Sequence, residues 1–408
     1  MLIGIDDTDS NTGMCTTYLA AKLCQRLNVK KTPKLVRLNP NIPYKTRGNG
    51  AIAFETEAED AEKVVLSYVK EYSMLTDENT NPGVAFLESD KIPEQLNRFY
   101  RKAVSELVSI EEAEKVAPSA NVTIHKFKNG RGIIGALAAL GLNGDRTYEL
   151  IAYRRPENYG KPRRIDRQSV VDMDISMYPR VFDNLDAKKR RILITPKGRD
   201  PIFCGIRGVT EHDVLAAWNM VRPLEDIECT QLFETNQATD AHLRRKEISK
   251  IRSYDCVIVD GVVSSKPKIL PGGHVIFTLK DGSGSIDCAA YKPSGVFRKA
   301  VGLLLPGDRV LACGGVGKYP GTINLEKIEV KSLAELTQRE PPLCCGKRMT
   351  SSGKDKGYKC RKCHKKVSQE KTKISQKVRE LMPGIYDAPP GSRRHLSKPA
   401  FMQGSSIP

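Results

Sequence analysis

Three carboxylates stand close together near the start of the chain, directly after an apolar segment. The apolar residues 2–5 are followed by Asp6, Asp7 and Asp9. Like charges at this spacing repel one another, so an ordinary surface turn gains nothing from them. Carboxylate oxygens are the ligands that hard divalent cations such as Mg²⁺ prefer. The sequence therefore predicts a cation site at the end of a strand.

The residues after these carboxylates can bind phosphate. Gly13 would permit a tight turn into an amphipathic helix over 15–27, which presents Thr16 and Thr17 in its first turn. A helix N-terminus offers N–H donors to anions, and threonine hydroxyls add donors or a nucleophile for phosphoryl transfer. Together with the acidic residues, this arrangement predicts a site for magnesium-bound nucleoside triphosphate. In the alternative interpretation, Asp9 or Thr12 merely caps the helix and the acids are solvated.

A second loop could also reach phosphate. The chain has no GxxxxGK[ST] motif, so nothing indicates a P-loop. The sequence RGNG instead supplies the cation Arg47 next to Gly48 and Asn49, just before an expected strand. We expect these three residues to contribute to nucleotide binding, although a simple turn is an equally good interpretation.

The chain contains 11 cysteines, an odd number that argues for reduced thiols rather than a disulfide framework. Four of them cluster within twenty residues and predict a zinc ribbon with ligands Cys344, Cys345, Cys360 and Cys363. The first pair departs from the usual C-x₂-C spacing, because Pro342 stands where a ligand would be expected. A three-cysteine site completed by His364 or water is the alternative.

The formal net charge of +18 indicates a polyanionic partner. Residues 341–408 hold 16 Lys and Arg against 4 Asp and Glu, so most of the excess lies at the C-terminal end. We interpret this segment as nucleic-acid-binding, the alternative being a basic tail that only maintains solubility. No signal peptide and no apolar run long enough to cross a bilayer is present, which predicts a cytoplasmic protein without a membrane partner.

The order of apolar and turn segments predicts a multidomain α+β protein. Residues 1–118 alternate strands and amphipathic helices and read as an ATP- and magnesium-binding α/β domain; residues 119–252 read as a compact α+β domain. Residues 253–336 contain five strands with a helix after the third, which is the order of an OB-fold barrel. Residues 337–408 would form the zinc ribbon and the basic tail.

Three segments of the second domain resemble binding loops or close-packed helices. Residues 130–141, GRGIIGALAALG, are rich in small side chains, which predicts close approach of the backbone to a ligand or to another helix. Residues 198–208, GRDPIFCGIRG, and 233–242, FETNQATDAH, gather polar residues between apolar runs. Plain surface loops are an equally good interpretation of the latter two.

Many of these motifs occur together, in the same order, in one known family. GIDDTDSNTGMCTTYLA, RGNGA, IGALAALG, TYELIAYR, DPIFCGIRG, FETNQATDAH, the OB segment, the cysteine cluster and RRHLSKP resemble the archaeal isoleucine-tRNA 2-agmatinylcytidine synthetases. The resemblance implies a kinase-like domain, a ferredoxin-like domain, an OB-fold and a zinc ribbon with a basic helical tail. It also implies ATP-dependent ligation of agmatine to carbon 2 of the wobble cytidine in a CAU-anticodon isoleucine tRNA, through a phosphorylated cytidine.

The resemblance further implies roles for individual residues. Asp6, Asp7 and Asp9 would hold Mg²⁺-ATP, and Thr16 would be the threonine that the enzyme phosphorylates on itself, with Thr17 as the alternative. Gly13, Thr17, Arg47, Gly48 and Asn49 would bind ATP, and Asp200 and Arg207 are the candidates for agmatine. The competing hypothesis is a non-catalytic OB-fold and zinc-ribbon factor that binds nucleic acid. Such a binder would gain nothing from concentrated negative charge near RNA.

Overall fold

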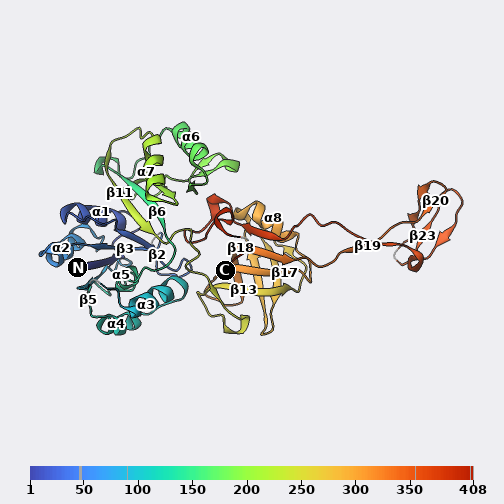
Figure 1. Ribbon diagram of the computed structural model, residues 1–408, viewed down its shortest axis with the longest axis horizontal. Coiled ribbons are helices and arrows are strands. Elements are labelled where there is room, and N and C mark those ends of the chain that lie inside the picture. The colour runs from blue at the N-terminus through green and yellow to red at the C-terminus, as the bar shows by residue number, and fades with distance from the viewer. Residues whose placement is uncertain (46–47, 90, 354, 405, 408) are drawn as a thin grey trace.

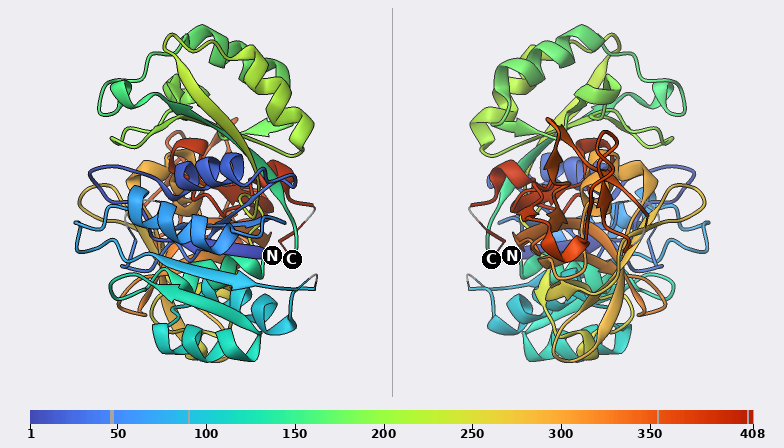
Figure 2. Two further views of the ribbon diagram at one scale, coloured as in Figure 1. Left: turned by 90° about the vertical axis from the view of Figure 1, so that its left-hand side faces the viewer. Right: turned by 90° about the vertical axis from the view of Figure 1, so that its right-hand side faces the viewer.

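The computed structural model describes residues 1–45, 48–89, 91–353, 355–404 and 406–407. Two α/β units share one sheet, a β-barrel stands beside them, and a small ribbon projects from the barrel on a long two-stranded stalk (Figure 1). The second unit, drawn in green and yellow-green, covers one side of the blue and cyan first unit (Figure 2). Within the described residues, no helix is both long and apolar enough to cross a membrane.

The first unit is a sheet covered by helices on both faces. Antiparallel pairing joins β1 to both β3 and β4, and the strand β1 is buried because its residues Leu2, Ile3 and Ile5 are apolar. The elements are β1 (Leu2–Asp6), α1 (Thr16–Arg26), β2 (Lys34–Arg37), β3 (Gly50–Glu55), α2 (Ala61–Tyr72), β4 (Gly83–Leu87), α3 (Glu94–Ser105), α4 (Ile110–Ser119), β5 (Val122–Lys126) and α5 (Ile133–Leu140).

The small residues of α5 pack against this sheet, so the first unit extends past residue 118. A side chain on Gly83 would place its Cβ 2.0 Å from the backbone nitrogen of Ile133, and one on Gly4 would lie 2.2 Å from the carbonyl oxygen of Ala136. The small-residue pattern of 130–141 predicts a close approach of the backbone, and the structure shows that the partner is the sheet rather than a ligand or another helix. Strand β5 pairs with β4 and forms one edge of the same sheet. From the sequence, β5 and α5 are assigned to the predicted second domain, residues 119–252, because a hydrophobic pattern does not show which sheet a strand or helix joins.

The second unit has the ferredoxin-like order. Its six elements follow the sequence βαββαβ, and the sheet order β11-β6-β10-β7 brings the last strand beside the first. They are β6 (Thr147–Arg154), α6 (Arg167–Met177), β7 (Val181–Phe182), β10 (Ile202–Gly208), α7 (Glu211–Met220) and β11 (Ile227–Thr235), with a small hairpin of β8 (Leu185–Asp186) and β9 (Arg191–Ile192). Strand β11 also pairs with β2, which fuses the two units into one sheet.

The barrel is an OB-fold, as predicted. Strands β13, β15, β16, β18 and β17 follow one another around it, and pairing of β13 with β15 closes it. Helix α8 lies between the third and fourth strands. The bounds are β12 (Arg244–Arg245), β13 (Cys256–Val263), β14 (Lys268–Ile269), β15 (Val275–Lys280), β16 (Ser285–Ala290), α8 (Val296–Gly302), β17 (Arg309–Val316) and β18 (Thr322–Ser332).

The C-terminal segment leaves the barrel and returns to it. Strand β19 (Thr337–Arg339) pairs with β25 (Ile374–Gln376) to form the stalk. The stalk carries the ribbon strands β20 (Leu343–Cys344), β21 (Lys347–Arg348), β22 (Thr350–Ser351), β23 (Tyr358–Lys359) and β24 (Lys366–Val367). After the stalk, β26 (Gly384–Asp387) pairs with β18.

The expectation of a basic helical tail is wrong for the part of the tail that is described. Beyond α8 the described chain forms strands and short 3₁₀ turns, such as those at 390–392 and 400–402, because proline and glycine interrupt it. We call residues 384–404 the strap. Its ion pair between Arg393 and Asp183 ties the barrel to the second unit.

Candidate active site

A cavity of about 320 Å³ lies between the first unit, the second unit and the strap. It brings together residues that the sequence predicted from widely separated motifs. Those that line it are Asp6, Asp7, Asp9, Thr16, Thr17, Gly48, Asn49, Asp200 and Arg207. Gly13 is not among the lining residues, and Arg47 falls outside the described residues. One chamber thus joins the expected nucleotide site to the expected agmatine site.

The acidic cluster is held by backbone geometry. Asp6 ends β1, and its carboxylate packs so closely on α5 that a Cβ on Gly135 would lie 1.9 Å from the Asp6 Oδ2. Asp7 adopts a left-handed backbone with φ of 60°, and its Oδ2 accepts a hydrogen bond of 3.1 Å from the backbone N–H of Asn81. A non-glycine residue in this region is strained, and such strain is found where side chains must be aimed.

These carboxylates are crowded enough to resist ionisation. Burial raises the pKa of Asp6 well above its ordinary value, and the neighbouring Asp7 raises it further. Burial also raises the pKa of Asp7 to about 6, although the N–H of Asn81 opposes the shift. A bound cation would remove this penalty, because it favours the charged form of every carboxylate around it. The oxygen donor set therefore fits Mg²⁺.

The turn into α1 differs from the expected one. Gly13 does not have a positive φ; Met14 takes the left-handed conformation instead, with φ of 59°. The helix begins at Thr16 after Cys15, which makes no side-chain cap, so neither Asp9 nor Thr12 caps it. The capping interpretation of the acidic cluster is thereby excluded. Spacing alone could not reveal which residue of the loop takes the strained conformation.

The two threonines of the first turn differ in their contacts. The Thr8 hydroxyl donates to Thr16 Oγ1 across 3.1 Å, and Thr17 Oγ1 lies 3.0 Å from Cys15 Sγ. Both threonine side chains are buried yet border the cavity. The Thr16 hydroxyl is therefore pre-aligned by a second hydroxyl, which suits a group that must receive or transfer a proton.

A buried charge network that sequence reasoning missed forms one wall. The carboxylate of Glu149 on β6 lies 3.3 Å from both Arg37 and Arg207, and Gln237 Nε2 donates to it across 2.6 Å. Burial raises the pKa of Glu149, but the Arg207 and Arg37 guanidinium groups outweigh burial and leave the pKa below its ordinary value. The signal available in the sequence was a glutamate in the middle of the mostly apolar strand TYELIAYR.

The predicted agmatine ligand Asp200 is already engaged. Its Oδ1 accepts hydrogen bonds of 3.1 Å from Arg163 and from the backbone N–H of Ile202. The strap contributes a further residue, His395, to the lining of the cavity. Enclosure lowers the pKa of His395 well below its ordinary value, and the charges of Arg207 and Arg37 lower it further, so the imidazole is neutral at pH 7.

Comparisons with known proteins agree with this architecture. Family models described as TiaS TCKD, TiaS FLD, an OB-fold nucleic acid binding domain and the TiaS C-terminal zinc ribbon match residues 2–57, 130–242, 257–331 and 341–381. The isoleucine-tRNA 2-agmatinylcytidine synthetase TiaS of Pyrococcus horikoshii is 48% identical over 99% of this chain and 97% of its own. This chain belongs to the TiaS family.

Solved structures of TiaS have the same fold. A complex of TiaS with its isoleucine tRNA and ATP is 41% identical with a TM-score of 0.89, and a complex with the tRNA, AMPCPP and agmatine is 38% identical with a TM-score of 0.87. Each alignment covers 99% of this chain and 97% of the other. The predicted family and its four-part fold are confirmed, and the chain is a tRNA-modifying synthetase. The hypothesis of a non-catalytic binding factor is therefore wrong.

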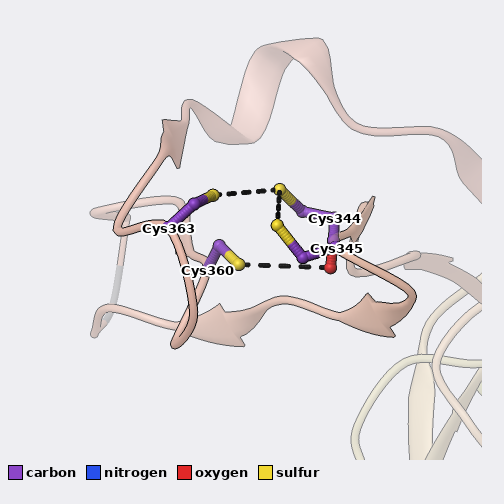
Figure 3. A group of neighbouring side chains, drawn as sticks. All are labelled: Cys344, Cys345, Cys360 and Cys363. Atoms are coloured by element: carbon purple, nitrogen blue, oxygen red, sulfur yellow. Dashed lines mark hydrogen bonds between the residues drawn. The ribbon is translucent and has the colours of Figure 1, made fainter.

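The cysteines of the TiaS zinc ribbon converge on one point, with their side chains facing one another (Figure 3). All four sulfurs lie within 4.8 Å of one another, and Cys344 Sγ is 3.4 Å from Cys363 Sγ. Tetrahedral zinc with Zn–S bonds of about 2.3 Å separates its sulfurs by about 3.8 Å, so the set fits zinc. The left-handed conformations of Cys345 and Gly346 let adjacent cysteines face inward, which replaces the missing ligand at Pro342.

Replacing Cys360 with serine should empty this site. Backbone N–H groups of Cys363 and Lys362 lower the pKa of Cys360 to about 6, so its thiolate forms readily and is ready to bind the metal. We expect Cys360→Ser to reduce bound zinc from about one equivalent to about a tenth or less. Elemental analysis of the purified chain measures it, with Cys229→Ser, outside the cluster, as the control. Full zinc content in the Cys360 variant would show that the ribbon is held in another way.

Proposed function

We propose that the chain joins agmatine to carbon 2 of the wobble cytidine in a CAU-anticodon isoleucine tRNA, at the expense of ATP, within this cavity. The observation that supports the proposal is the meeting of three acidic residues, two threonines and the second-unit loop at one chamber. Relatives with this architecture are named for the same product and have been crystallised with tRNA, nucleotide and agmatine. Action on tRNA supports a cytoplasmic location, which is part of this proposal.

Asp6, Asp7 and Asp9 would hold Mg²⁺, which neutralises phosphate charge when it is bound. The neighbouring cations of the cavity, Arg37 and Arg131, would oppose the remaining charge of the triphosphate. Gly48 and Asn49 also line the cavity. The Asn49 side chain donates to the carbonyl of Asn39, so we assign the nucleotide contact at this loop to its backbone. Roles for Gly13 and Arg47 remain predictions.

The reaction needs two bonds to change in order. The carbon-2 oxygen of cytosine belongs to a urea-like carbonyl and does not leave as oxide, so a phosphoryl group from ATP is first transferred to it. The agmatine amine then attacks carbon 2, the phosphate departs with that oxygen, and the amine loses its proton. The chain's contribution is to place these groups in line and exclude water.

Agmatine would occupy the end of the cavity lined by Asp200 and Arg207. Agmatine is a dication at neutral pH, so its site should present negative or neutral groups. Asp200 carries the required charge, although Arg163 shares it. Arg207 shares the carboxylate of Glu149 with Arg37, so that carboxylate offsets only part of the repulsion between the Arg207 guanidinium and the approaching dication. We therefore keep both as candidates, with Asp200 as the direct ligand.

The complete reaction tests the proposal. Purified chain incubated with Mg²⁺, labelled agmatine, ATP and a transcript of the isoleucine tRNA should transfer label to the RNA. Omission of ATP, or replacement of the wobble cytidine by uridine, should abolish incorporation. Label that fails to enter the RNA under the full conditions would contradict the proposed function.

Thr16 is the proposed acceptor for self-phosphorylation. Thr16→Val should reduce phosphate incorporation from labelled ATP into the protein by about tenfold or more, because the isosteric side chain has no hydroxyl to accept the group. Thr12→Val, on the exposed part of the loop, is the matched control and should retain it. Mass spectrometry of the labelled peptide decides between Thr16 and Thr17. Phosphate found on Thr17 alone would overturn the assignment.

A further inference from the structure

One histidine faces the reaction chamber, as we call the cavity of about 320 Å³ described above. Among the described residues, His395 is the only histidine in its lining. The residue is exposed, and its side chain has no hydrogen-bond or ion-pair partner in the described part of the chain. A molecule in the chamber can therefore reach the imidazole without displacing another side chain.

The carboxylates of the chamber wall are already engaged. Asp6, Asp7 and Asp9 form the oxygen donor set that we assign to Mg²⁺. The other four each face a cation, in the pairs Glu106 with Lys246, Glu149 with Arg37 and Arg207, Asp183 with Arg393, and Asp200 with Arg163. A carboxylate in such a pair is a weak base, because protonation would leave its cation unpaired. His395 can accept a proton without breaking an ion pair.

The strap backbone holds His395 in place. The N–H of Ala238 donates to the carbonyl of His395 across 2.8 Å, and the N–H of Asp240 donates to the carbonyl of Leu396 across 2.8 Å. Ala238 and Asp240 both have left-handed backbones, with φ of 54° and 61°. Non-glycine residues keep such strained conformations where the surrounding structure requires them. The FETNQATDAH segment thus fixes the strap, and with it the imidazole, at the chamber wall.

The charges around His395 keep its imidazole neutral. Enclosure lowers the pKa of His395, and the guanidinium groups of Arg207 and Arg37 lower it further. A neutral imidazole has a free lone pair and does not repel a dication such as agmatine. The charged groups that line the chamber with it are Arg37 of β2, Lys45, Glu106, Arg131, Glu149 of β6, Asp183, Asp200 and Arg207 of β10, together with Asp6, Asp7 and Asp9. The ammonium of Lys45 donates to the carbonyl of Pro40 and has no lone pair to offer.

The agmatine step of the proposed reaction releases a proton that needs an acceptor. The agmatine nitrogen attacks carbon 2 as a neutral amine and carries a positive charge once the C–N bond has formed. That nitrogen is far more acidic than the free ammonium, because its electron pair is now shared with an electron-poor carbon. A base with a lowered pKa can therefore take this proton, although it would not deprotonate free agmatine.

We propose that His395 accepts this proton and is the general base of the agmatine step. The inference rests on the proposed function, which places agmatine and the phosphorylated cytidine in the chamber. A ring nitrogen of His395 takes the proton from the newly bonded nitrogen, the bond between carbon 2 and the phosphorylated oxygen breaks, and phosphate leaves with that oxygen. The imidazolium then releases its proton to solvent. His395 takes no part in the phosphoryl transfer that comes first.

Chemical rescue tests this assignment. His395→Ala removes the imidazole and leaves room for a free one, whereas His395→Gln fills the space with a side chain that cannot take a proton. Single-turnover agmatidine formation by each full-length variant should fall by about a hundredfold, while tRNA affinity stays within about twofold of the wild type. Excess free imidazole should raise the rate of His395→Ala by about tenfold and leave that of His395→Gln unchanged.

The pH dependence of the rescue separates proton transfer from a structural effect. Recovery should increase between about pH 6 and about pH 8, because only the neutral form of imidazole accepts a proton. His212→Ala, at an exposed position in the first turn of α7, is the matched control. This control should form agmatidine at the wild-type rate and should not respond to imidazole.

Two results would overturn the inference. A wild-type rate in His395→Ala would show that the proton does not pass to this residue. A loss that imidazole does not recover at any pH would show that His395 only shapes the chamber wall. Either result requires an active wild-type chain, so it would leave the proposed function standing. A wild-type chain that forms no agmatidine would contradict the proposed function and this inference together.

Discussion

Asp7→Asn should reduce agmatidine formation by about a thousandfold while the free energy of unfolding stays the same or rises. Asparagine keeps the shape of aspartate and tolerates the left-handed backbone found at this residue, so the loop should retain its conformation. The substitution removes one charge of the oxygen donor set beside the transferred phosphate, which is where electrostatic stabilisation acts. The variant should lose its catalytic activity and keep its fold.

The stability readout follows from the crowding of the carboxylates. Burial and Asp9 raise the pKa of Asp7 to about 6. Above that pH the ionised carboxylate therefore lowers the free energy of unfolding. A neutral amide relieves the repulsion between Asp7 and its neighbours, and the variant should unfold at the same or a higher temperature in metal-free buffer.

Three measurements check this prediction. They are agmatidine formation under saturating substrates, tRNA affinity by titration, and the thermal midpoint of unfolding. Affinity for tRNA should stay within about twofold, because we expect most RNA contacts to come from the barrel and the ribbon, to which Asp7 does not belong. Asp172→Asn, on an exposed face of α6, is the matched control and should leave all three unchanged. Wild-type activity in Asp7→Asn would remove this residue from the reaction.

Excision of the ribbon should weaken tRNA binding by about tenfold to a hundredfold and flatten its dependence on salt. Residues 340–373 hold 11 Lys and Arg against 3 Asp and Glu, a concentration of charge suited to phosphate contacts. Each phosphate contact that is lost reduces the slope of log K against log salt by about one. An unchanged slope of log K against log salt would show that the ribbon charges serve solubility and not RNA binding.

The strand pairing of the stalk indicates which residues can be removed without disturbing the rest of the chain. Arg339 and Ile374 face each other across the β19–β25 pair, so a short glycine turn can join them after residues 340–373 are removed. Simple truncation after residue 340 would also delete β26, the strap and Arg379, whose guanidinium lies 2.8 Å from the buried Asp308. The excised chain keeps these contacts. It should still phosphorylate itself, which separates a loss of RNA binding from a loss of folding.

Local patterns in the sequence determined most of the elements and their chemistry. The strand that ends in Asp6 and Asp7, the helix that begins at Thr16, the five strands of the barrel and the four cysteines all follow from residue types over short windows. Such windows suffice because hydrophobic period, turn residues and metal-ligand spacing act over a few residues.

Only the tertiary structure decided which distant segments meet. Pairing of β2 with β11 places Glu149 and Gln237 against Arg37. The strap, which follows the ribbon in the sequence, places His395 in the wall of the reaction chamber. The same is true of α5, whose glycines seat it on the first sheet. These contacts join residues separated by about fifty positions or more, and their energies depend on complementary surfaces that no single window of sequence contains.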